Sequence, residues 1–434
     1  MTSRRLRGLD WLNFFVADVQ TGFGPFIAVY LTARHWTQGD IGLALSIGTI
    51  AAAISQVPAG AIVDAVPSKR MTATFGILTV TLTALIFALW PLRLSVYIAE
   101  VMHGFASCLL VPSIAAISLA LVGHKRLGER LGRNARFAGV GNGIAAAVMG
   151  AIGAYFSTRA VFWLTAALAI PAIIALRMIG RVRVPPALEG ARIPPGWAGL
   201  RELFTDRALI VFFACAFLFH LSNAAMLPLA AAEVTKKAEG LANVIIAACI
   251  VVPQICVALL SPWVGRTAHR VGRRRLMLLG WLSLPVRGLL MAAFPDPWVL
   301  VALQVFSGVS AAVFGVMLPL ISADVTRGSN RFNLCMGTMG LAVFGGATVS
   351  TSMAGWLADS FNEHVAFLGL SAAGLLGVLL IWAAMPETKE DQAEEPITLI
   401  RLRPKPAMAF IPPRLAEIPT SISGRAKWPG SGTK

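Results

Sequence analysis

"GRTAHRVGRRR", residues 265–275, places five arginines within eleven residues. Apolar runs flank this stretch on both sides, at about residues 241–264 and 276–295. A basic run in such a setting can be a nucleic-acid-binding patch, a solvated helix face, or the rim of a larger structure. The composition and pattern of the rest of the chain decide among these three interpretations.

The composition favours a membrane protein. Of the 434 residues, 56% are hydrophobic and only 13% are charged, whereas a soluble domain carries about 25% charged residues. The formal net charge of +16 is compatible with nucleic-acid binding. The basic residues, however, lie in short loops between apolar runs and not on a water-soluble face with aromatic or polar partners. We therefore expect no nucleic-acid partner.

The apolar runs are long enough to span a bilayer. A helix of about 20 apolar residues crosses roughly 30 Å of hydrocarbon with its backbone groups satisfied internally. The first run contains Asp18 and Gln20 and shows no small-residue cleavage site, so we expect a retained helix and not a signal peptide. Twelve spanning segments are predicted, at about residues 11–33, 41–63, 71–90, 94–122, 137–157, 160–180, 208–230, 241–264, 276–295, 298–323, 332–358 and 365–385.

Lysine and arginine indicate the orientation. With a cytoplasmic N-terminus, 31 of the 37 basic residues fall in cytoplasmic segments, five fall outside, and Arg287 lies within a span. Cytoplasmic loops carry this excess of positive charge. We therefore expect a multi-pass protein of a bacterial-type inner membrane with both termini in the cytoplasm. Residues 265–275 are then a cytoplasmic loop between the eighth and ninth segments.

The chain repeats itself at an offset of 205 residues. "GAIVDAVPSKR", residues 60–70, aligns with residues 265–275, so that Gly60 matches Gly265 and Asp64 matches His269. Parallel repeats of this kind build several transporter folds. We expect two pseudo-symmetric six-helix bundles, a basic proline-containing cytoplasmic linker and a disordered cytoplasmic tail. Their predicted bounds are 1–180, 208–385, 181–207 and 386–434, respectively.

The repeated loop resembles the signature of the major facilitator superfamily of secondary transporters, G-x-x-x-D-R-x-G-R-R or close to it. The first copy keeps Gly60 and Asp64 and ends in Lys69 and Arg70, but it has Ala65 and Pro67 where arginine and glycine are usual. The second copy has His269 in place of the acid and matches the other positions with Gly265, Arg270, Gly272, Arg273 and Arg274. The resemblance covers about residues 10–386 and implies an all-α membrane fold of twelve helices.

In the family, the acid of this motif contacts the opposite bundle on the cytoplasmic side and holds the outward-facing state. Asp64 ends the second segment, and the start of the eleventh, near Arg331 and Phe332, offers the positive end of a helix dipole. The resemblance thus predicts a latch worth about 1 kcal/mol. The alternative is that Asp64 serves topology alone. His269 is neutral much of the time, which predicts a weaker second copy whose arginines serve topology and anionic lipid.

Polar residues inside the spans are the candidates for transport chemistry, because ionisable groups at membrane depth are costly. In the family, helices 1, 4, 7 and 10 line the central cavity. Asp18 and Glu100 are candidate proton carriers, since a carboxyl in a low-dielectric cavity can be neutral or charged near neutral pH. Glu100 can instead face only the outer vestibule, and His220 can be a packing histidine. The predicted cavity residues are Asp18, Gln20, Glu100, His103, His220, Asn223 and Gln304.

Other features of the sequence narrow the function. Arg287 in the ninth segment is expected at the periphery, where it pairs with an acid or extends to the membrane surface, and a structural role is favoured. The five cysteines lack metal-ligand spacing, and Walker motifs are absent. We expect no metal and no cofactor.

These observations predict a monomeric secondary transporter that moves a small molecule by alternating access, coupled to protons and acting as an exporter. The sparse charge of the predicted lining favours an amphipathic or lipophilic solute. One alternative is a non-transporting sensor or assembly partner on the same fold. Another is a membrane-embedded transferase, for which only His103 with Glu100 comes near a catalytic cluster, so we expect no enzyme.

Overall fold

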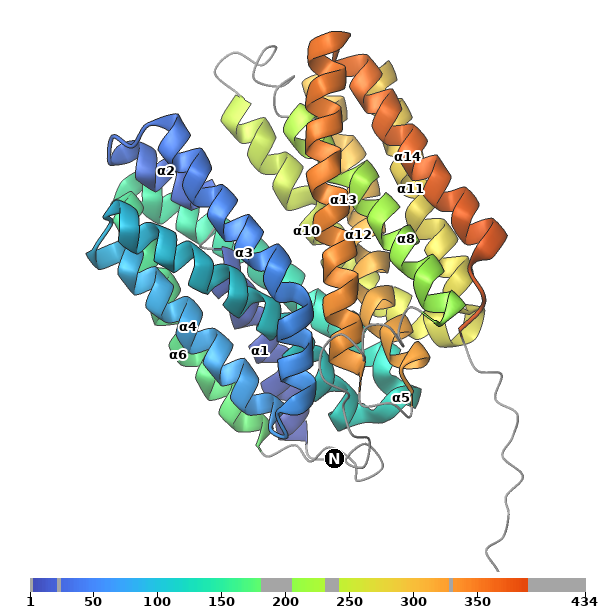
Figure 1. The fold of residues 1–434 in the computed structure, drawn as a ribbon, viewed down its shortest axis with the longest axis horizontal. Coiled ribbons are helices and arrows are strands. Elements are labelled where there is room, and N and C mark those ends of the chain that lie inside the picture. Colours follow the sequence, from blue (N-terminus) through green and yellow to red (C-terminus); the bar gives the residue numbers. More distant parts are fainter. Residues whose placement is uncertain (1–2, 22–24, 181–204, 231–241, 328–330, 389–434) are drawn as a thin grey trace, which may run out of the picture. The chain divides into compact units, whose positions relative to one another are not determined.

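The computed structural model describes residues 3–21, 25–180, 205–230, 242–327 and 331–388. This part of the chain is helical apart from short connections (Figure 1). Its helices are α1 Ser3–Thr21, α2 Pro25–Ala33, α3 Gln38–Ala65, α4 Lys69–Leu89, α5 Arg93–Tyr155, α6 Thr158–Ile179, α8 Arg207–Asn223, α10 Ala242–Val271, α11 Arg273–Ala293, α12 Pro297–Val325, α13 Phe332–Ser360 and α14 Glu363–Ala384.

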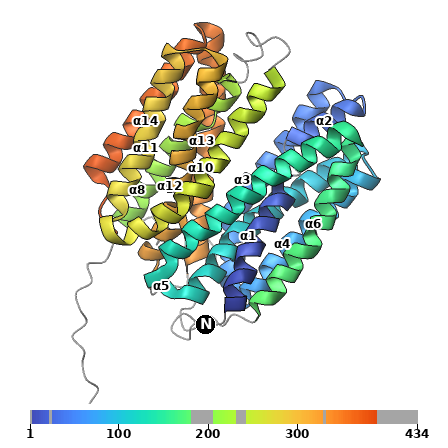
Figure 2. The ribbon, with the colours of Figure 1, turned by 180° about the vertical axis from the view of Figure 1, so that it is seen from behind.

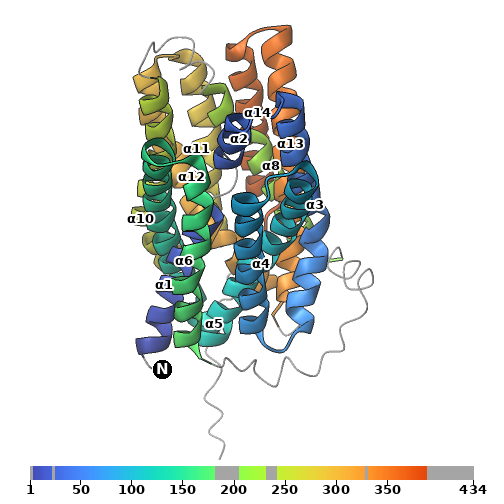
Figure 3. The same ribbon diagram turned by 90° about the vertical axis from the view of Figure 1, so that its left-hand side faces the viewer.

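The described helices confirm the prediction of an all-α membrane protein. Ten of them are long and apolar enough to cross a bilayer, and the longest, Arg93–Gly153, contains one predicted span and most of the next. Large apolar side chains that a soluble protein would bury are exposed, for example Ile54 at 71% and Leu259 at 69%. Figure 3 shows the long helices running alongside one another, as spanning helices do. These exposed apolar faces are available to contact lipid.

One predicted loop is helical. Residues 123–136 were expected to connect two spans, but α5 continues from residue 93 to residue 155 with a single break at Gly123. Gly123 has φ +68° and ψ 174°, a conformation that side chains with a Cβ rarely adopt. Residues 124–136 are rich in Leu, Arg, Lys and Glu, which favour helix. Leu127 and Leu131 are buried, so packing stabilises this segment as helix although its charge suggested a loop.

Several helix starts follow from capping residues. Asp296 accepts hydrogen bonds from the amides of Trp298 and Val299 at 2.9 and 3.1 Å, and Pro297 occupies the first turn of α12. Asp206 caps α8 in the same way, through the amides of Ala208 and Leu209. A cap of this kind stabilises a helix by about 1 kcal/mol.

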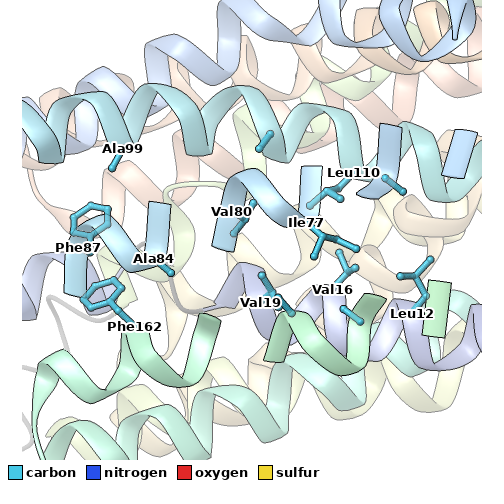
Figure 4. Packing of buried hydrophobic residues seen from close by; sticks show 14 of the residues in the cluster. Leu12, Val16, Val19, Ile77, Val80, Ala84, Phe87, Ala99, Leu110 and Phe162 are labelled. Atoms are coloured by element: carbon cyan, nitrogen blue, oxygen red, sulfur yellow. The ribbon is translucent and has the colours of Figure 1, made fainter. Parts of the chain in front are cut away.

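The core of the N-terminal bundle lies among α1, α2, α3, α4, α5 and α6. Figure 4 shows Leu12, Val16 and Ile77 packed together near one end of it. At the other end the rings of Phe87 and Phe162 stack with their centroids 5.0 Å apart. Tyr30 donates a hydrogen bond of 2.8 Å from its hydroxyl to the carbonyl of Phe87, so the buried polar atom is satisfied.

The described residues up to 388 form one compact unit. Within it the two bundles meet chiefly along two helix pairs, with further contacts between α5 and α12. The first pair is α3 with α13, and the second is α5 with α10 (Figures 1 and 2). The predicted linker, apart from residues 205–207, and the tail beyond residue 388 lie outside the described residues. The predicted bundle boundaries therefore stay a prediction, while the two-halved fold is confirmed by the comparisons reported below.

The two helix pairs obey the same internal repeat as the sequence. A Cβ on Gly60 would collide with the carbonyl oxygen of Asn333, and a Cβ on Gly265 would collide with that of Gly128. Both partners in the second contact lie 205 residues before or after those in the first. The offset holds again further along the same helices: Gly337 meets the backbone of Gln56 as Gly132 meets that of Ser261. Each pair approaches closely because glycine leaves the space.

Candidate functional site

Asp64, at the end of α3, binds the first turn of α13. Its Oδ1 accepts hydrogen bonds from the backbone amide of Asn333 at 3.1 Å and from the side-chain amide of Asn333 at 2.6 Å, and its Oδ2 accepts one from the Leu334 amide at 2.7 Å. Asp64 is 5% exposed. Arg331, the N-cap residue of α13, makes no side-chain cap bond. The other bundle thus supplies the cap and places a carboxylate at the positive end of the helix dipole.

Lys69 fixes the position of Asp64 through the backbone. Its Nζ donates hydrogen bonds to the carbonyl oxygens of Val63, Asp64 and Val66 at 2.6, 3.0 and 3.0 Å. These carbonyls belong to the last turn of α3 and to its C-cap residue Val66, where acceptors have no intrahelical partner. Lys69 therefore terminates α3 at the residue that carries the carboxylate. Arg70, the next motif residue, is half-buried.

The second motif copy lacks such a cap for a reason visible in the backbone. Its His269 lies against Gly128 of α5, as Asp64 lies against the start of α13. Asn333 and Leu334 are the second and third residues of α13 and have free amides, whereas Gly128 lies five residues beyond the break at Gly123. The amides near Gly128 are bonded within their own helix. A carboxylate at position 269 would find no free donors there.

Acids of its own bundle hold the second copy instead. Arg273 is 5% exposed, forms an ion pair with Asp324 at 2.9 Å, and donates to the carbonyl of Ala268 at 3.1 Å. Glu387 accepts from the backbone amides of Arg273 and Arg274 at 2.8 and 3.2 Å and so caps α11.

Gly272 and Glu387 explain two further features of this region. Two features require glycine at position 272. Its φ is +98°, which residues with a Cβ rarely adopt, and a Cβ there would collide with the Glu387 carboxylate. The tail expected to be disordered from residue 386 is therefore packed at least as far as Thr388, which bonds Asp324 at 3.5 Å. Arg270, the remaining motif arginine, is exposed.

Glu100 is the buried carboxyl of the N-terminal bundle. It lies in α5, is 4% exposed, and its Oε1 has no hydrogen-bond partner among the described residues. Its other oxygen abuts Gly48 of α3, where a Cβ would leave no room. His103, one turn further along, lies 3.2 Å from the Ser107 hydroxyl through Nε2. This burial favours a Glu100 carboxyl packed between α3 and α5 over one that faces the outer vestibule.

Asp18 and Gln20 fall on the backbone of α1, but their side chains lie outside the described part of the structure. Their predicted roles stay predictions.

Arg287 organises the polar residues of the C-terminal bundle. It is 1% exposed and donates hydrogen bonds of 2.8 Å to Asn223 Oδ1 in α8 and 3.1 Å to Gln304 Oε1 in α12. In the described chain, no carboxylate forms an ion pair with it, and its Nε has no partner. Its burial contradicts the expectation that Arg287 extends to the membrane surface, and no acid among the described residues pairs with it. Two neutral amides from predicted cavity helices hold it inside the bundle.

His220, three residues before Asn223 on α8, lies among aromatic rings. Its ring centroid lies 5.2 Å from that of Phe219 and 5.0 Å from that of Phe314. Its buried Nε2 has no partner among the described residues. The contacts are those of a packing histidine, with one polar atom left over. In the described chain, no hydrogen bond joins the Arg287 cluster to Glu100, which belongs to the other bundle.

Sequence reasoning missed a buried ionic network within the N-terminal bundle. Asp10 of α1, 3% exposed in its side chain, binds Arg130 and Arg133 of α5. Arg130, 4% exposed, also donates to Asn134 at 2.7 Å, and Asn134 donates to Ser118 at 2.8 Å. The one sequence feature that points to this network is Asp10, an acid directly before the first predicted span. The sequence does not predict the pairing, because the partner arginines lie 120 or more residues away.

The described residues contain no group of three potential metal ligands close together.

Comparison with known proteins finds a matching family model and relatives named as transporters or resistance proteins. The sequence model of the Major Facilitator Superfamily matches residues 11–250 and 212–416. An uncharacterised MFS-type transporter of Mycobacterium tuberculosis (strain ATCC 25618 / H37Rv) is 33% identical over 417 residues, which are 93% of this chain and 97% of that protein. The class C tetracycline resistance protein of Escherichia coli is 30% identical over 154 residues, 36% of each protein.

Solved structures share the fold at low sequence identity. The human organic anion transporter MFSD10 (TETRAN) superposes with a TM-score of 0.69 at 14% identity, covering 88% of this chain and 100% of that one. The E. coli fucose:proton symporter FucP gives a TM-score of 0.72 at 14% identity, covering 87% and 97%. At this identity the likeness shows the two-halved fold alone.

Proposed function

Because the chain belongs to the Major Facilitator Superfamily, we propose that it is a proton-coupled secondary transporter that exports a small molecule by alternating access. The observation that carries this proposal is the bond between Asp64 and the start of α13. It joins the two bundles through a few hydrogen bonds and one helix dipole. A contact of about 1 kcal/mol is strong enough to bias a conformational equilibrium and weak enough to open.

The proposed orientation follows from the positive charge. The latch lies at the end of α3 that carries Lys69 and Arg70, which the lysine and arginine distribution assigns to the cytoplasm. The conformation described is then closed toward the cytoplasm. The termini are cytoplasmic and the membrane is the bacterial inner membrane in this proposal.

Glu100 is proposed as the proton carrier. Among the described residues, one oxygen of this buried carboxyl has no partner and no cation is bonded to it. Such a carboxyl can exist in the protonated form at low energetic cost. Deprotonation leaves a buried negative charge, which favours rearrangement of the surrounding helices or access of water. Proton binding and conformation are thereby linked.

Export and the kind of substrate rest on two supports. Relatives over parts of the chain include tetracycline resistance proteins of Escherichia coli and the multidrug resistance protein MdtG of Dickeya zeae, 31% identical over 110 residues. The predicted lining is mainly apolar. Its polar groups are few: Asn223 and Gln304 beside Arg287 in the C-terminal bundle, and Glu100 and His103 in the N-terminal bundle. We propose a lipophilic substrate with few polar groups.

The test begins with a thermal-stability screen of the purified protein against metabolites and drugs, tetracycline included. Compounds that stabilise it are then assayed for flux into proteoliposomes with and without a pH gradient. The proposal expects flux that the gradient accelerates. Binding without flux would favour the sensor interpretation and overturn the transporter.

A further inference from the structure

A cavity of about 520 Å³ lies where α1, α5 and α10 meet. Its walls come from both bundles, since α10 contributes Pro262 and Arg266 and the other residues lie on α1 and α5. It borders the close contact between Gly128 and Gly265. The cavity is separate from Glu100 and from the Arg287 cluster, neither of which lines it.

The charged end of the cavity is positive. Arg133, Arg136 and Arg266 line it together with a single acid, Glu129. Glu129 lies 3.7 Å from Arg126 in an ion pair, and Arg133 is held by Asp10. Arg136 and Arg266 are exposed and form no ion pair within the described residues. Two arginines therefore point their uncompensated charge at one small volume.

The polarity of the cavity changes along the axis of α5. On α5, residues 129, 133, 136, 137 and 140 share one helical face. From Arg133 to Val140, seven steps along the helix, the axis rises about 10 Å, and the side chains change from charged to apolar. The same gradient runs from Arg266 to Pro262 on α10.

An aromatic group forms the apolar end. Trp11 is 46% exposed, and its ring centroid lies 6.1 Å from that of Phe137. Tryptophan of this kind is typical of the boundary between headgroups and acyl chains. Arg133 lies 5.7 Å above the ring of Phe137, where the charged and apolar ends meet.

We propose that this cavity binds an anionic glycerophospholipid, its phosphate on Arg136 and Arg266 and an acyl chain along Trp11 and Val140. Charge alone would suit any phosphate, but a free ion would leave the apolar half of the cavity unfilled. Because Arg266 and Arg136 belong to different bundles, the bound lipid holds together the faces that meet at Gly128 and Gly265. It thus stabilises the conformation described here. Only the assignment to the cytoplasmic leaflet rests on the proposed function.

The test measures lipid retention and needs no transport assay. The full-length chain is purified from nanodiscs of phosphatidylcholine with or without phosphatidylglycerol, and bound lipid is counted by native mass spectrometry. The double variant R136Q/R266Q is compared with the control R177Q/R275Q, which removes two exposed arginines outside the cavity. Both variants are required to melt like the wild type in phosphatidylcholine.

The expected result is selective retention of phosphatidylglycerol by wild type and control, falling about fivefold for each cavity arginine removed. Trp11→Ala should lower retention of both lipids. Equal retention by R136Q/R266Q and control would overturn the proposal. A second result would also overturn it: inorganic phosphate that raises the melting temperature of the wild type as much as phosphatidylglycerol does. The site would then bind a soluble anion. If R136Q/R266Q fails to fold, the single variants R136Q and R266Q supply the same comparison.

Discussion

The carboxylate of Asp64 accepts a hydrogen bond of 2.7 Å from the backbone amide of Leu334, a residue 270 positions further along the chain. An acid of the N-terminal bundle thus caps the first turn of α13, a helix of the C-terminal bundle. Its energy is small compared with the packing of either bundle, so it can open while both bundles remain folded. Alternating access requires such a contact between bundles, one that is weaker than the packing within each bundle.

Asp64→Asn should open the contact more often. The amide keeps one acceptor but loses the charge that interacts with the helix dipole, at a cost of about 1 kcal/mol, or roughly fivefold in population. Cys335 is a native reporter, since it is buried with no exposed surface one residue beyond Leu334. Maleimide labelling of Cys335, followed by peptide mass spectrometry, should rise about fivefold. The exposed Asp359→Asn serves as control, and unchanged labelling of Cys335 in Asp64→Asn would argue against the latch.

His269→Asp should not create a second latch. The equivalent amides on α5 are bonded within their own helix, because that helix restarts at Gly123, well before Gly128. A half-buried carboxylate without donors destabilises the fold by about 1 kcal/mol. Thermal melting of His269→Asp against His269→Asn measures the difference. A His269→Asp protein that melts higher than wild type would contradict this account.

Gln304→Leu should destabilise the C-terminal bundle. It removes one of the two described acceptors of a fully buried guanidinium, which costs about 2 kcal/mol or more. Removing the charge as well, in Arg287→Met with Gln304→Leu, should restore most of the lost stability. Melting curves of the wild type, both single variants and the pair form a double-mutant cycle. Additive losses in the pair would show that Arg287 and Gln304 do not depend on each other.

Glu100→Gln should uncouple flux from the proton gradient. The amide matches the carboxyl in shape beside Gly48 but cannot release a proton, so the fold is kept and the gradient loses its effect. Gradient-driven flux of any compound found in the stability screen should fall to the level without a gradient. Asp359→Asn, which removes an exposed carboxyl outside both the Glu100 site and the cavity, is the control. Full gradient-driven flux in Glu100→Gln would remove this residue from the mechanism.

The sequence predicted those parts of the molecule that follow from local pattern. Apolar length predicted the spans, and the repeat around Gly60 and Gly265 predicted two similar halves. The dipole at the start of a helix pointed to the region of Phe332 as the partner of Asp64, and the structure places the contact at the next two residues.

What the sequence did not predict depends on distant pairing or on competition between local signals. Charge suggested a loop at residues 123–136, but the burial of Leu127 and Leu131 favours helix. The environment of Arg287 required knowing that α8 and α12 place amides beside it. Glu387 was assigned to a tail because prolines and charges surround it, yet its carboxylate caps α11.

The central claim is that opening one end of the interface closes the other. Pulsed EPR distances between labels at exposed positions 67 and 327 report the Asp64 end, and labels at exposed positions 34 and 361 report the opposite end. In Asp64→Asn, the account predicts a longer distance population for the first pair and a shorter one for the second. Lengthening of both pairs, or no change in either, would contradict alternating access through this latch.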